Sequence, residues 1–185
     1  WSGNGAPYVH ADQHDIVFLP GSSTTFYCAN DGGLYKTTNT GSTWVDLSNN
    51  LEIAQQYRLG LSATTEGTLV AGHQDNGTTK LSSGSWSEIY GGDGMDCFID
   101  RTNNSIIYSS YANGDYSRST NGGGNWSSIN SGLPSGDWVS SWHQDPVSAT
   151  TVYAGGRAAL YKTTNSGSAW TTLGTPSGSG NVIEF

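Results

Sequence analysis

Short segments in which apolar and polar residues alternate recur along the chain, separated by stretches rich in Gly, Asn, Ser and Thr. In the first quarter such segments run from His14 to Leu19 and from Thr25 to Ala29, and in the third quarter from Cys97 to Asp100 and from Ser105 to Ser109. Alternation with a period of two over about four to eight residues is typical of β-strands that bury one face. The pattern therefore predicts an all-β protein built from short strands.

The chain also repeats itself with a period near 42 residues, and each repeat carries a tryptophan. The tryptophans of the repeat are Trp1, Trp44, Trp86, Trp126 and Trp170. Three of them end nearly the same phrase, which covers residues 35–44, 117–126 and 161–170, and a shortened form covers 80–86. Each phrase joins two strand-like segments through Asn, Ser and Gly, so it predicts a hairpin turn. Two more strand-like segments precede it, and four strands in about 42 residues is typical of a propeller blade.

The repeated phrase resembles the Asp-box, or BNR repeat, of sialidases, xyloglucanase-type glycoside hydrolases, sortilin-type receptor domains and many secreted bacterial propellers. The resemblance covers all four repeats and implies a β-propeller with four-stranded antiparallel blades. Asn39, Asn121 and Asn165 stand where the family's Asp usually stands. Asn keeps an oxygen that accepts turn hydrogen bonds but lacks the charge, so we expect these three residues to be structural.

The repeat also predicts how the chain is divided. We expect blades at about residues 10–50, 51–92, 93–134 and 135–178, with residues 181–185 as the first strand of a following blade. Trp1 corresponds to the end of a preceding repeat. The sequence therefore predicts about four blades that form part of a larger ring, and the rest of that propeller is the first partner we expect.

The resemblance also predicts which residues share a face. In family propellers the repeated turn joins the last two strands of a blade, so the links between blades and the turns between the second and third strands emerge at the opposite rim. The candidate ligand-binding residues on that rim are Asp12, His14, Asp31, Gln74, Asp75, Asn76, Asp93 and Trp138. Carboxylates, amides and flat aromatic faces suit sugars. The alternative interpretation is that Asp-Gly and Asn-Gly pairs are simply good turn formers.

A divalent cation is a further hypothesis for this rim. His10, Asp12 and His14 alternate along one segment that we expect to be extended, so their side chains would project to one side and could hold a cation. Ca²⁺ in the acidic turns is the alternative. Apart from such a cation, no cofactor is predicted. His73 and His143 lie in predicted strands and are expected to be packed.

Composition excludes several classes of protein. Seven Lys and Arg against fifteen Asp and Glu give a net charge of −8, which repels phosphate backbones and anionic lipids, so no nucleic-acid partner is expected. No apolar run approaches the roughly 20 residues of a membrane span, so no membrane insertion is expected. Cys28 and Cys97 have neither metal-ligand nor redox spacing, and we expect them to be small buried hydrophobic residues.

Together these observations favour a secreted or cell-surface propeller module that binds carbohydrate or a protein partner through one acidic, aromatic-containing rim. The turns around Asp31, Asp75 and Asp93 resemble sortilin-type modules, which are taken to bind rather than cleave. The enzyme alternative is a glycoside hydrolase of the xyloglucanase or sialidase type, for which no catalytic residue is assigned. A sialidase needs converging arginines, whereas Arg101 and Arg118 are expected at the wrong rim. A scaffold without a ligand is the third hypothesis.

Overall fold

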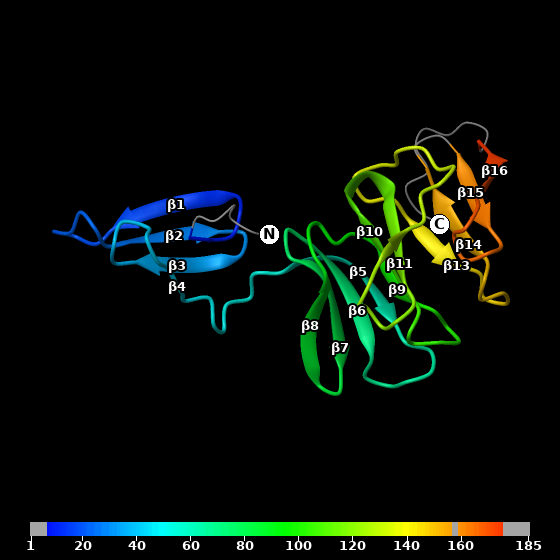
Figure 1. Ribbon diagram of the computed structural model, residues 1–185, viewed down its shortest axis with the longest axis horizontal. Helices are drawn as coiled ribbons and strands as arrows, with labels where there is room; N and C mark the ends of the chain where they lie inside the picture. The colour runs from blue at the N-terminus through cyan, green and yellow to red at the C-terminus, as the bar shows by residue number, and fades with distance from the viewer. Residues whose placement is uncertain (1–6, 157–158, 176–185) are drawn as a thin grey trace. The chain divides into compact units, whose positions relative to one another are not determined.

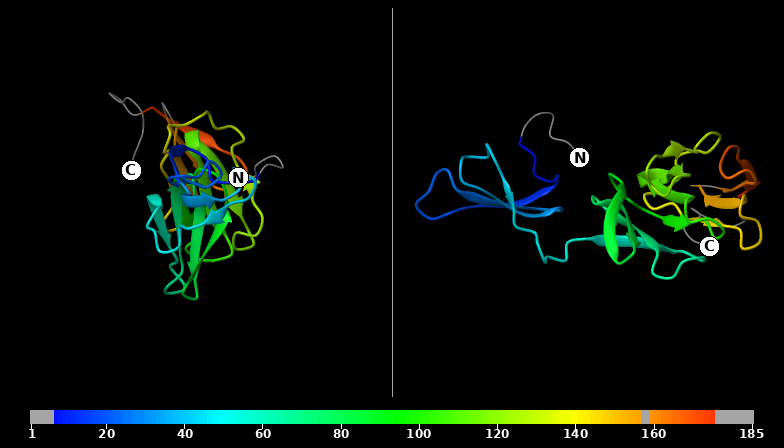
Figure 2. Two further views of the ribbon diagram at one scale, coloured as in Figure 1. Left: turned by 90° about the vertical axis from the view of Figure 1, so that its left-hand side faces the viewer. Right: turned by 60° about the horizontal axis from the view of Figure 1, so that its bottom comes forward.

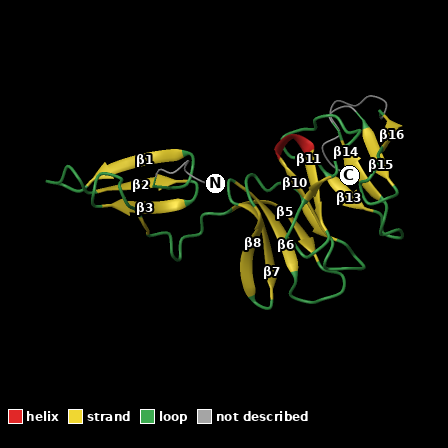
Figure 3. Ribbon diagram, viewed as in Figure 1, coloured by secondary structure: helices red, strands yellow, loops and turns green. Residues whose placement is uncertain are grey.

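The computed structural model describes residues 7–156 and 159–175 of the chain, and its long elements are all strands (Figure 1). The one helix among the described residues is a single 3₁₀ turn, η1 (Ala112–Gly114), shown in red in Figure 3. No described helix is therefore long and apolar enough to span a membrane. Trp1, Arg157 and the predicted strand at 181–185 lie outside the described residues.

The strands form four sheets of four strands each. The first sheet contains β1 (Gln13–Phe18), β2 (Phe26–Asn30), β3 (Gly33–Thr37) and β4 (Val45–Asp46). The second contains β5 (Gln55–Leu61), β6 (Leu69–Gln74), β7 (Gly77–Ser82) and β8 (Ser85–Tyr90). The third contains β9 (Cys97–Ile99), β10 (Ile107–Tyr111), β11 (Asp115–Ser119) and β12 (Ser127–Ser128). The fourth contains β13 (Trp142–Gln144), β14 (Val152–Gly155), β15 (Leu160–Thr163) and β16 (Thr171–Gly174).

Strand order within each sheet follows chain order, and neighbouring strands are antiparallel. In the third sheet, for example, Tyr108 of β10 lies opposite Phe98 of β9 and Arg118 of β11. An up-and-down sheet of four strands is the arrangement of a propeller blade. The prediction of an all-β protein with four-stranded antiparallel sheets is therefore confirmed.

The repeated phrase forms the turn between the third and fourth strands, and its hydrogen bonds explain its composition. In the fourth sheet the Thr163 hydroxyl donates to Asn165 Oδ1 over 2.8 Å and accepts the Gly167 N–H over 3.0 Å. Asn165 Oδ1 also accepts the Ala169 N–H over 2.9 Å. The same bonds recur around Asn39 and Asn121. The side-chain oxygen of Asn is thus used in the turn itself, as its predicted structural role requires.

The second sheet replaces this phrase with a shorter hairpin. Only Ser83 and Gly84 separate β7 from β8, and both have positive φ, 52° and 79°. Two consecutive positive φ values are typical of the type I′ turn, whose twist matches that of the flanking strands. Trp86 then lies on β8 with its side chain 51% exposed. Trp86 is therefore not equivalent to the tryptophans that follow the long turns.

The chain divides into two compact units, and each is described here by itself (Figure 2). The first unit, residues 1–55, holds the first sheet, and its small core includes Cys28 and Thr37. Every residue of β1 is exposed, including Ile16, Val17 and Phe18 at 54%, 56% and 52%. A single blade buries little because its two faces are normally covered by neighbouring blades.

The second unit, residues 56–185, contains the other sheets, and its repeats contact one another through the tryptophans. Trp126 Nε1 donates to the carbonyl of Ile89, which belongs to the preceding sheet, over 2.7 Å. Trp170 Nε1 donates to the carbonyl of Ile129 over the same distance. Each of these two tryptophans therefore connects its own sheet to the one before it.

Aromatic residues fill the space between the third and fourth sheets. Tyr108, Tyr116 and Trp142 are buried in one cluster, with the partly buried Phe98 packed against it. The Phe98 and Tyr108 rings stack with centroids 4.6 Å apart, and Trp142 meets Tyr108 edge-on at 5.6 Å. Aromatic pairs in these geometries stabilise a core beyond the area that they bury. The stacked sheets of the second unit thus share an aromatic core, whereas the first unit has only its small core.

Two predictions about histidine and cysteine can be checked here. Cys28 and Cys97 are free and buried, as expected, and burial raises the pKa of both thiols. His73 is buried, and its Nε2 lies 2.7 Å from the Thr79 hydroxyl oxygen. The prediction for His143 was wrong, because this residue of β13 is exposed. The alternation along β13 buries Trp142 and Gln144 instead and turns His143 outward.

Candidate functional site

A chain of side-chain hydrogen bonds connects three distant segments of the second unit. Trp138, in the link that precedes β13, donates through Nε1 to the Tyr57 hydroxyl over 3.2 Å. The Tyr57 hydroxyl donates in turn to Gln74 Oε1 over 2.5 Å. Tyr57 lies on β5 and Gln74 ends β6. These bonds fix the orientation of the indole ring. Trp138 is nevertheless 47% exposed, so its ring is both fixed and accessible to solvent.

Two carboxylates lie beside this series of hydrogen bonds. Asp75 follows Gln74 directly and adopts a positive φ of 58°, and its N–H donates to Asp93 Oδ1 over 3.1 Å. Asn76 Nδ2 donates to the Gln74 carbonyl over 3.1 Å. The predicted residues Gln74, Asp75, Asn76, Asp93 and Trp138, together with Tyr57, are called the rim cluster below.

Tyr111 closes the rim cluster on the side of the third sheet. Its ring lies so near Gly92 that a Cβ there would come within 2.2 Å of Tyr111 Cε2. Burial raises the pKa of Tyr111, and the negative charge of Asp93 raises it further. Tyr111 ends β10 next to its partner Asp115, whereas the turn around Asn121 follows the other end of β11. The rim residue and the turn residue thus lie at opposite ends of this sheet.

The remaining predicted residues lie in the first unit, where His14 and Asp31 form a pair. His14 Nε2 is bonded to Asp31 Oδ1, and this hydrogen bond and the Asp31 charge raise the pKa of His14. Asp12 is exposed and has a positive φ of 55°. His10 is buried, and a Cβ on Gly32 would overlap its side chain.

The expected alternation of His10, Asp12 and His14 was therefore wrong, because the left-handed backbone at Asp12 interrupts the extended segment. His10 packs into the first sheet while His14 is exposed on β1. His14 and Asp31 form an ion pair across the β1–β2 end of the sheet, and a carboxylate oxygen of Asp12 lies within 4.8 Å of one of Asp31.

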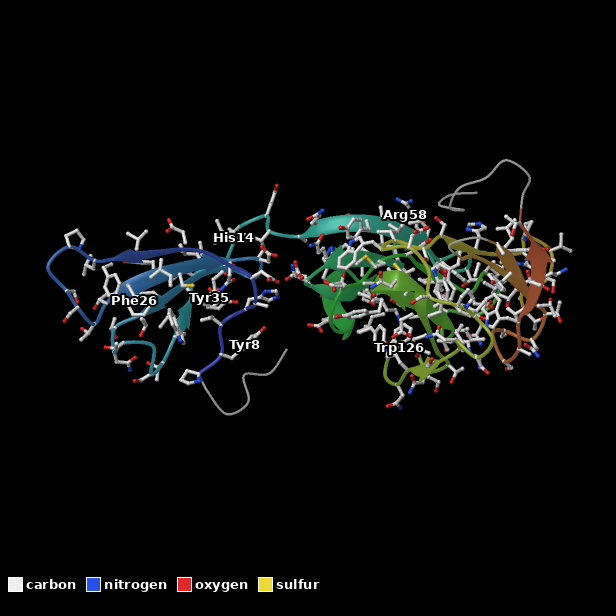
Figure 4. All side chains as sticks on the ribbon, turned by 90° about the horizontal axis from the view of Figure 1, so that it is seen from above. Tyr8, His14, Phe26, Tyr35, Arg58 and Trp126 are labelled. Carbon is white, nitrogen blue, oxygen red and sulfur yellow. The ribbon has the colours of Figure 1, made fainter. Side chains whose placement is uncertain are left out.

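A cleft of about 440 Å³ runs along the first strands of the three sheets in the second unit. It is lined by residues of β5, β9 and β13 and of the segments before and after β9 and β13, and we call it the inner-strand cleft. Its charged side chains are Arg58, Asp96 and Arg101, and His143 also lines it. Figure 4 labels Arg58 and, on the other side of the same unit, Trp126 of an outer turn. The cleft therefore belongs to the inner strands, whereas the repeated turns lie elsewhere.

Asp96 is held rigidly at one end of the cleft. Its Oδ2 accepts the Trp142 N–H over 3.3 Å, and its carbonyl accepts Trp142 Nε1 over 3.2 Å. Its own N–H donates to the Ser110 hydroxyl over 3.0 Å. Burial raises the pKa of Asp96 to about 6, although the hydrogen bond from Trp142 and the positive charge of Arg58 act in the opposite direction. A carboxyl group with this pKa can both donate and accept a proton near neutral pH.

Arg101 was expected at the rim opposite the candidate ligand-binding residues. Arg101 does follow β9 in the turn before β10, as predicted, with its guanidinium bonded to the Val147 carbonyl. Both Arg58 and Arg101 nevertheless line the inner-strand cleft. The expectation treated each rim as a separate surface, whereas the three-residue strand β9 is so short that one cleft reaches both of its ends.

Sequence reasoning did not identify Asp96 or His143 as site residues. Asp96 was visible only as the end of an acidic link, and His143 as one polar residue in a strand. Their place in the cleft depends on how neighbouring sheets pack, because Asp96 is held by Trp142 of the next sheet. The available sequence signal was a His that directly follows Trp142 in a predicted first strand, because neighbouring residues of a strand point to opposite faces.

Known structures show the class to which this fold belongs. An ancestral GH74 enzyme matches 92% of this chain and 25% of its own, with 23% identity and a TM-score of 0.54. The GH74 xyloglucanase from Xanthomonas campestris matches 89% of this chain and 31% of its own, with 12% identity and a TM-score of 0.53. The extracellular domain of a proposed one-component system from B. thetaiotaomicron matches 88% and 22%, with 17% identity and a TM-score of 0.52.

The fold is that of a β-propeller, and the prediction of four-stranded propeller blades is confirmed. The chain spans a quarter of the length of the first of these structures. At 12 to 23% identity the likeness shows the fold alone. The sequence matches no protein-family model and no curated protein sequence.

Proposed function

We propose that this chain is a carbohydrate-binding part of a secreted or cell-surface β-propeller, and that the rim cluster of the second unit holds the sugar. The observation that carries the proposal is the hydrogen-bonded chain from Trp138 through Tyr57 to Gln74. A sugar offers an apolar ring face and many hydroxyl groups, and it therefore needs an aromatic platform beside planar acceptors. A platform fixed before the ligand arrives loses less entropy on binding.

Three further observations support the same proposal. Asp75 and Asp93 supply carboxylate acceptors within the cluster, and the backbone N–H of Asp75 keeps Asp93 in place. The turn phrase around Asn39, Asn121 and Asn165 resembles the Asp-box of secreted propellers, and its hydrogen bonds suit that assignment. The structural neighbours include GH74 enzymes and an extracellular domain.

Glycan-array binding followed by calorimetry with Trp138→Ala tests this function. We expect the best-bound glycan to lose about 5- to 10-fold in affinity, because one stacking aromatic contributes roughly 1 kcal/mol beyond its buried area. Trp86→Ala is the matched control, since Trp86 is exposed to a similar extent, 51% against 47%, but lies on β8 outside the rim cluster. Equal losses in both variants, or no glycan binding by the unsubstituted chain, would refute the proposal.

The second candidate function is a glycoside hydrolase, and Asp96 is the observation that favours it. Hydrolysis of a glycosidic bond needs a carboxylic acid that stays protonated near neutral pH beside a second, ionised carboxylate. Asp96 has a pKa of about 6 and lines a cleft, where it would supply the acid, and the second carboxylate would have to come from outside the described lining of that cleft. Release of reducing ends from β-glucans, abolished in Asp96→Asn, would favour the hydrolase, whereas glycan binding without release would favour the binding module.

A further inference from the structure

We propose that the inner-strand cleft binds the carboxylate groups of an acidic oligosaccharide, so that the ligand of this propeller is a uronic-acid glycan. This inference rests on the proposed carbohydrate-binding function and specifies its ligand.

The cleft begins where the rim cluster ends. Arg58 follows Tyr57 on β5, and its Nη1 donates to the Tyr57 carbonyl over 3.2 Å. Asp96 follows Asp93 by three residues in the link that leads into β9, and Ser141 follows Trp138 by three residues in the link that leads into β13. The same three segments thus supply first the rim cluster and then the cleft. A chain of sugars stacked on Trp138 can therefore continue into the cleft.

Positive charge is scarce in this acidic chain, and the cleft holds two of its seven cationic residues. Lys36 and Lys162 lie over tyrosine rings of their own sheets at 5.5 Å. Lys80 and Arg118 donate to carbonyl groups of the next repeat's turn, those of Gly122 and Ser166. Among the described residues, Arg58 and Arg101 are the cations that line this cleft, where Arg101 also donates to the Val147 carbonyl and the charge of Arg58 acts on Asp96.

Arginine is the cation best suited to a carboxylate, because its planar guanidinium matches the two oxygens. Arg58 lies near the Asp96 end of β9, because its charge acts on the Asp96 carboxyl group and its carbonyl accepts from the Cys97 thiol over 4.0 Å. Arg101 lies beyond the other end of β9, where its N–H donates to Gln144 Oε1 over 2.9 Å. The three residues of β9 cover roughly 10 Å of extended chain, so the two arginines would meet different sugars of one oligosaccharide.

Apolar groups lie between the two arginines. Leu59 and Leu61 line the cleft and are 58% and 71% exposed, and Phe98 lies on β9 in the same cleft. Alternating cations and apolar surface match a uronic-acid glycan, which presents apolar ring faces between its carboxylates. Asp96 supplies the one carboxylate among the residues that line the described cleft. Its negative charge would repel the carboxylates of the ligand.

The test uses the whole chain and oligogalacturonate, measured by calorimetry beside its fully methyl-esterified form. Esterification removes each negative charge and leaves the sugar backbone in place. We expect the free acid to bind at least 10-fold more tightly, and its affinity to fall as salt rises because charged contacts are screened. Affinity for the acid alone should fall about 10-fold in Arg58→Gln and in Arg101→Gln.

Two further variants separate the cleft from general charge and from folding. Lys80→Gln removes the same charge outside the cleft and should leave affinity for the acid unchanged. Asp96→Asn removes the opposing charge and should strengthen binding of the acid several-fold, which no loss of folding can imitate. Because Arg101 also bonds the Val147 carbonyl, Arg101→Lys serves as the variant that keeps its charge and should retain part of the affinity.

The outcomes also distinguish this inference from the function on which it rests. Equal affinity for acid and ester, with both lost in Trp138→Ala, would overturn the cleft assignment while keeping the carbohydrate-binding rim. Loss of acid binding in Lys80→Gln as large as in Arg58→Gln would also overturn it. Failure of both forms and of every glycan on an array would overturn the proposed function itself.

Discussion

The first sheet and the fourth sheet share one sequence motif but differ in what they bury. Both have four antiparallel strands in chain order, and the hydrogen bonds of Thr37 and Asn39 in one turn match those of Thr163 and Asn165 in the other. Yet β1 is exposed throughout, whereas Trp142 and Gln144 of β13 are buried. The turn is thus a local structure that a single blade forms, while the core depends on neighbouring blades.

The tryptophan after each turn shows the same difference. Trp170 donates to the Ile129 carbonyl of the preceding sheet, and Gly167 of the same turn lies against the Ile129 side chain. In the first unit, Trp44 meets Phe26 of its own sheet edge-on, with ring centroids 5.4 Å apart. The geometry that the turns share therefore has two roles. It closes the hairpin within one sheet, and where sheets stack it also places the tryptophan against the preceding sheet.

The largest expected effect is a difference in local stability between the two units. In the 185-residue chain we expect backbone amides of Cys28 and Tyr35, which pair across β2 and β3, to exchange with deuterium about 1,000-fold faster than those of Tyr108 and Ser109 in β10. The buried core around Tyr108 must open before its amides exchange. Hydrogen exchange followed by mass spectrometry measures this, and equal protection would show that the first sheet is stable alone.

Substitution of the turn glycines should break the similarity between the two units. A Cβ on Gly167 would lie 2.6 Å from Ile129 Cδ1, whereas on Gly41 it would lie 3.5 Å from Trp44 Cζ2. Both glycines have positive φ, 89° and 82°, so alanine is strained at either position. We expect Gly167→Ala to lower the free energy of unfolding by about 3 kcal/mol and Gly41→Ala by about 1 kcal/mol.

Denaturant unfolding, with exchange used to assign the loss to one unit, measures the two glycine variants. Unchanged stability of Gly167→Ala would mean that the Ile129 side chain can move aside at little cost in free energy. The contact between Gly167 and Ile129 would then not be tightly packed. An equal loss in both variants would assign the whole effect to backbone strain.

The sequence predicted the repeating structure well and the packing between repeats poorly. The phrase around Asn121 predicted its turn because all the bonds form within a few residues. His143 was wrongly expected to be packed because the sequence does not show which face of its three-residue strand is buried, and the place of Arg101 in the cleft depends on residues more than 40 positions away, such as Gln144. The bond from Trp138 to Tyr57 joins residues 81 positions apart, so the pattern could place both at one rim but could not predict the contact.

Asp96 should make the second unit less stable as the pH rises, whereas a carboxylate with a lowered pKa makes a fold more stable as the pH rises. Its folded pKa of about 6 lies above its usual value, so the ionised form is disfavoured in the fold and the resulting penalty is present above pH 6. The penalty disappears as the pH falls from 6 to about 4. Asp96→Asn should therefore raise the free energy of unfolding by roughly 2 kcal/mol at pH 7, with the gain vanishing near pH 4.

Asp46→Asn in the first unit is the control for Asp96. The hydrogen bonds of Ser48 lower the pKa of Asp46, so its ionised form contributes stability that is lost as the pH falls through that lowered pKa. The control should lose a little stability at neutral pH rather than gain it. Thermal unfolding between pH 4 and 8 measures both variants, and a gain in Asp96→Asn that persists at pH 4 would show that charge is not its cause.

The smallest expected effect should be the same in both units. Lys36 and Lys162 each lie opposite a tyrosine of the second strand, Tyr27 and Tyr153, with Nζ 5.5 Å from the ring centroid. Each contact joins adjacent strands of one sheet, so neighbouring sheets should not change it. Lys36→Met and Lys162→Met should each lower the free energy of unfolding of their own unit by about 0.5 kcal/mol.

Equal losses of stability in Lys36→Met and Lys162→Met would show that the contact between Lys and Tyr belongs to a single blade and does not depend on the stacking of sheets. The backbone N–H groups of Ser148 and Val147 are the main cause of the lowered pKa of Asp145, and Lys162 adds a smaller charge contribution that salt screens because Asp145 is near solvent. The comparison should therefore be made by denaturant unfolding at high ionic strength. A clearly larger loss for Lys162→Met under these conditions would mean that stacking strengthens even the cross-strand pairs, and the turn bonds of the two units would then need the same comparison.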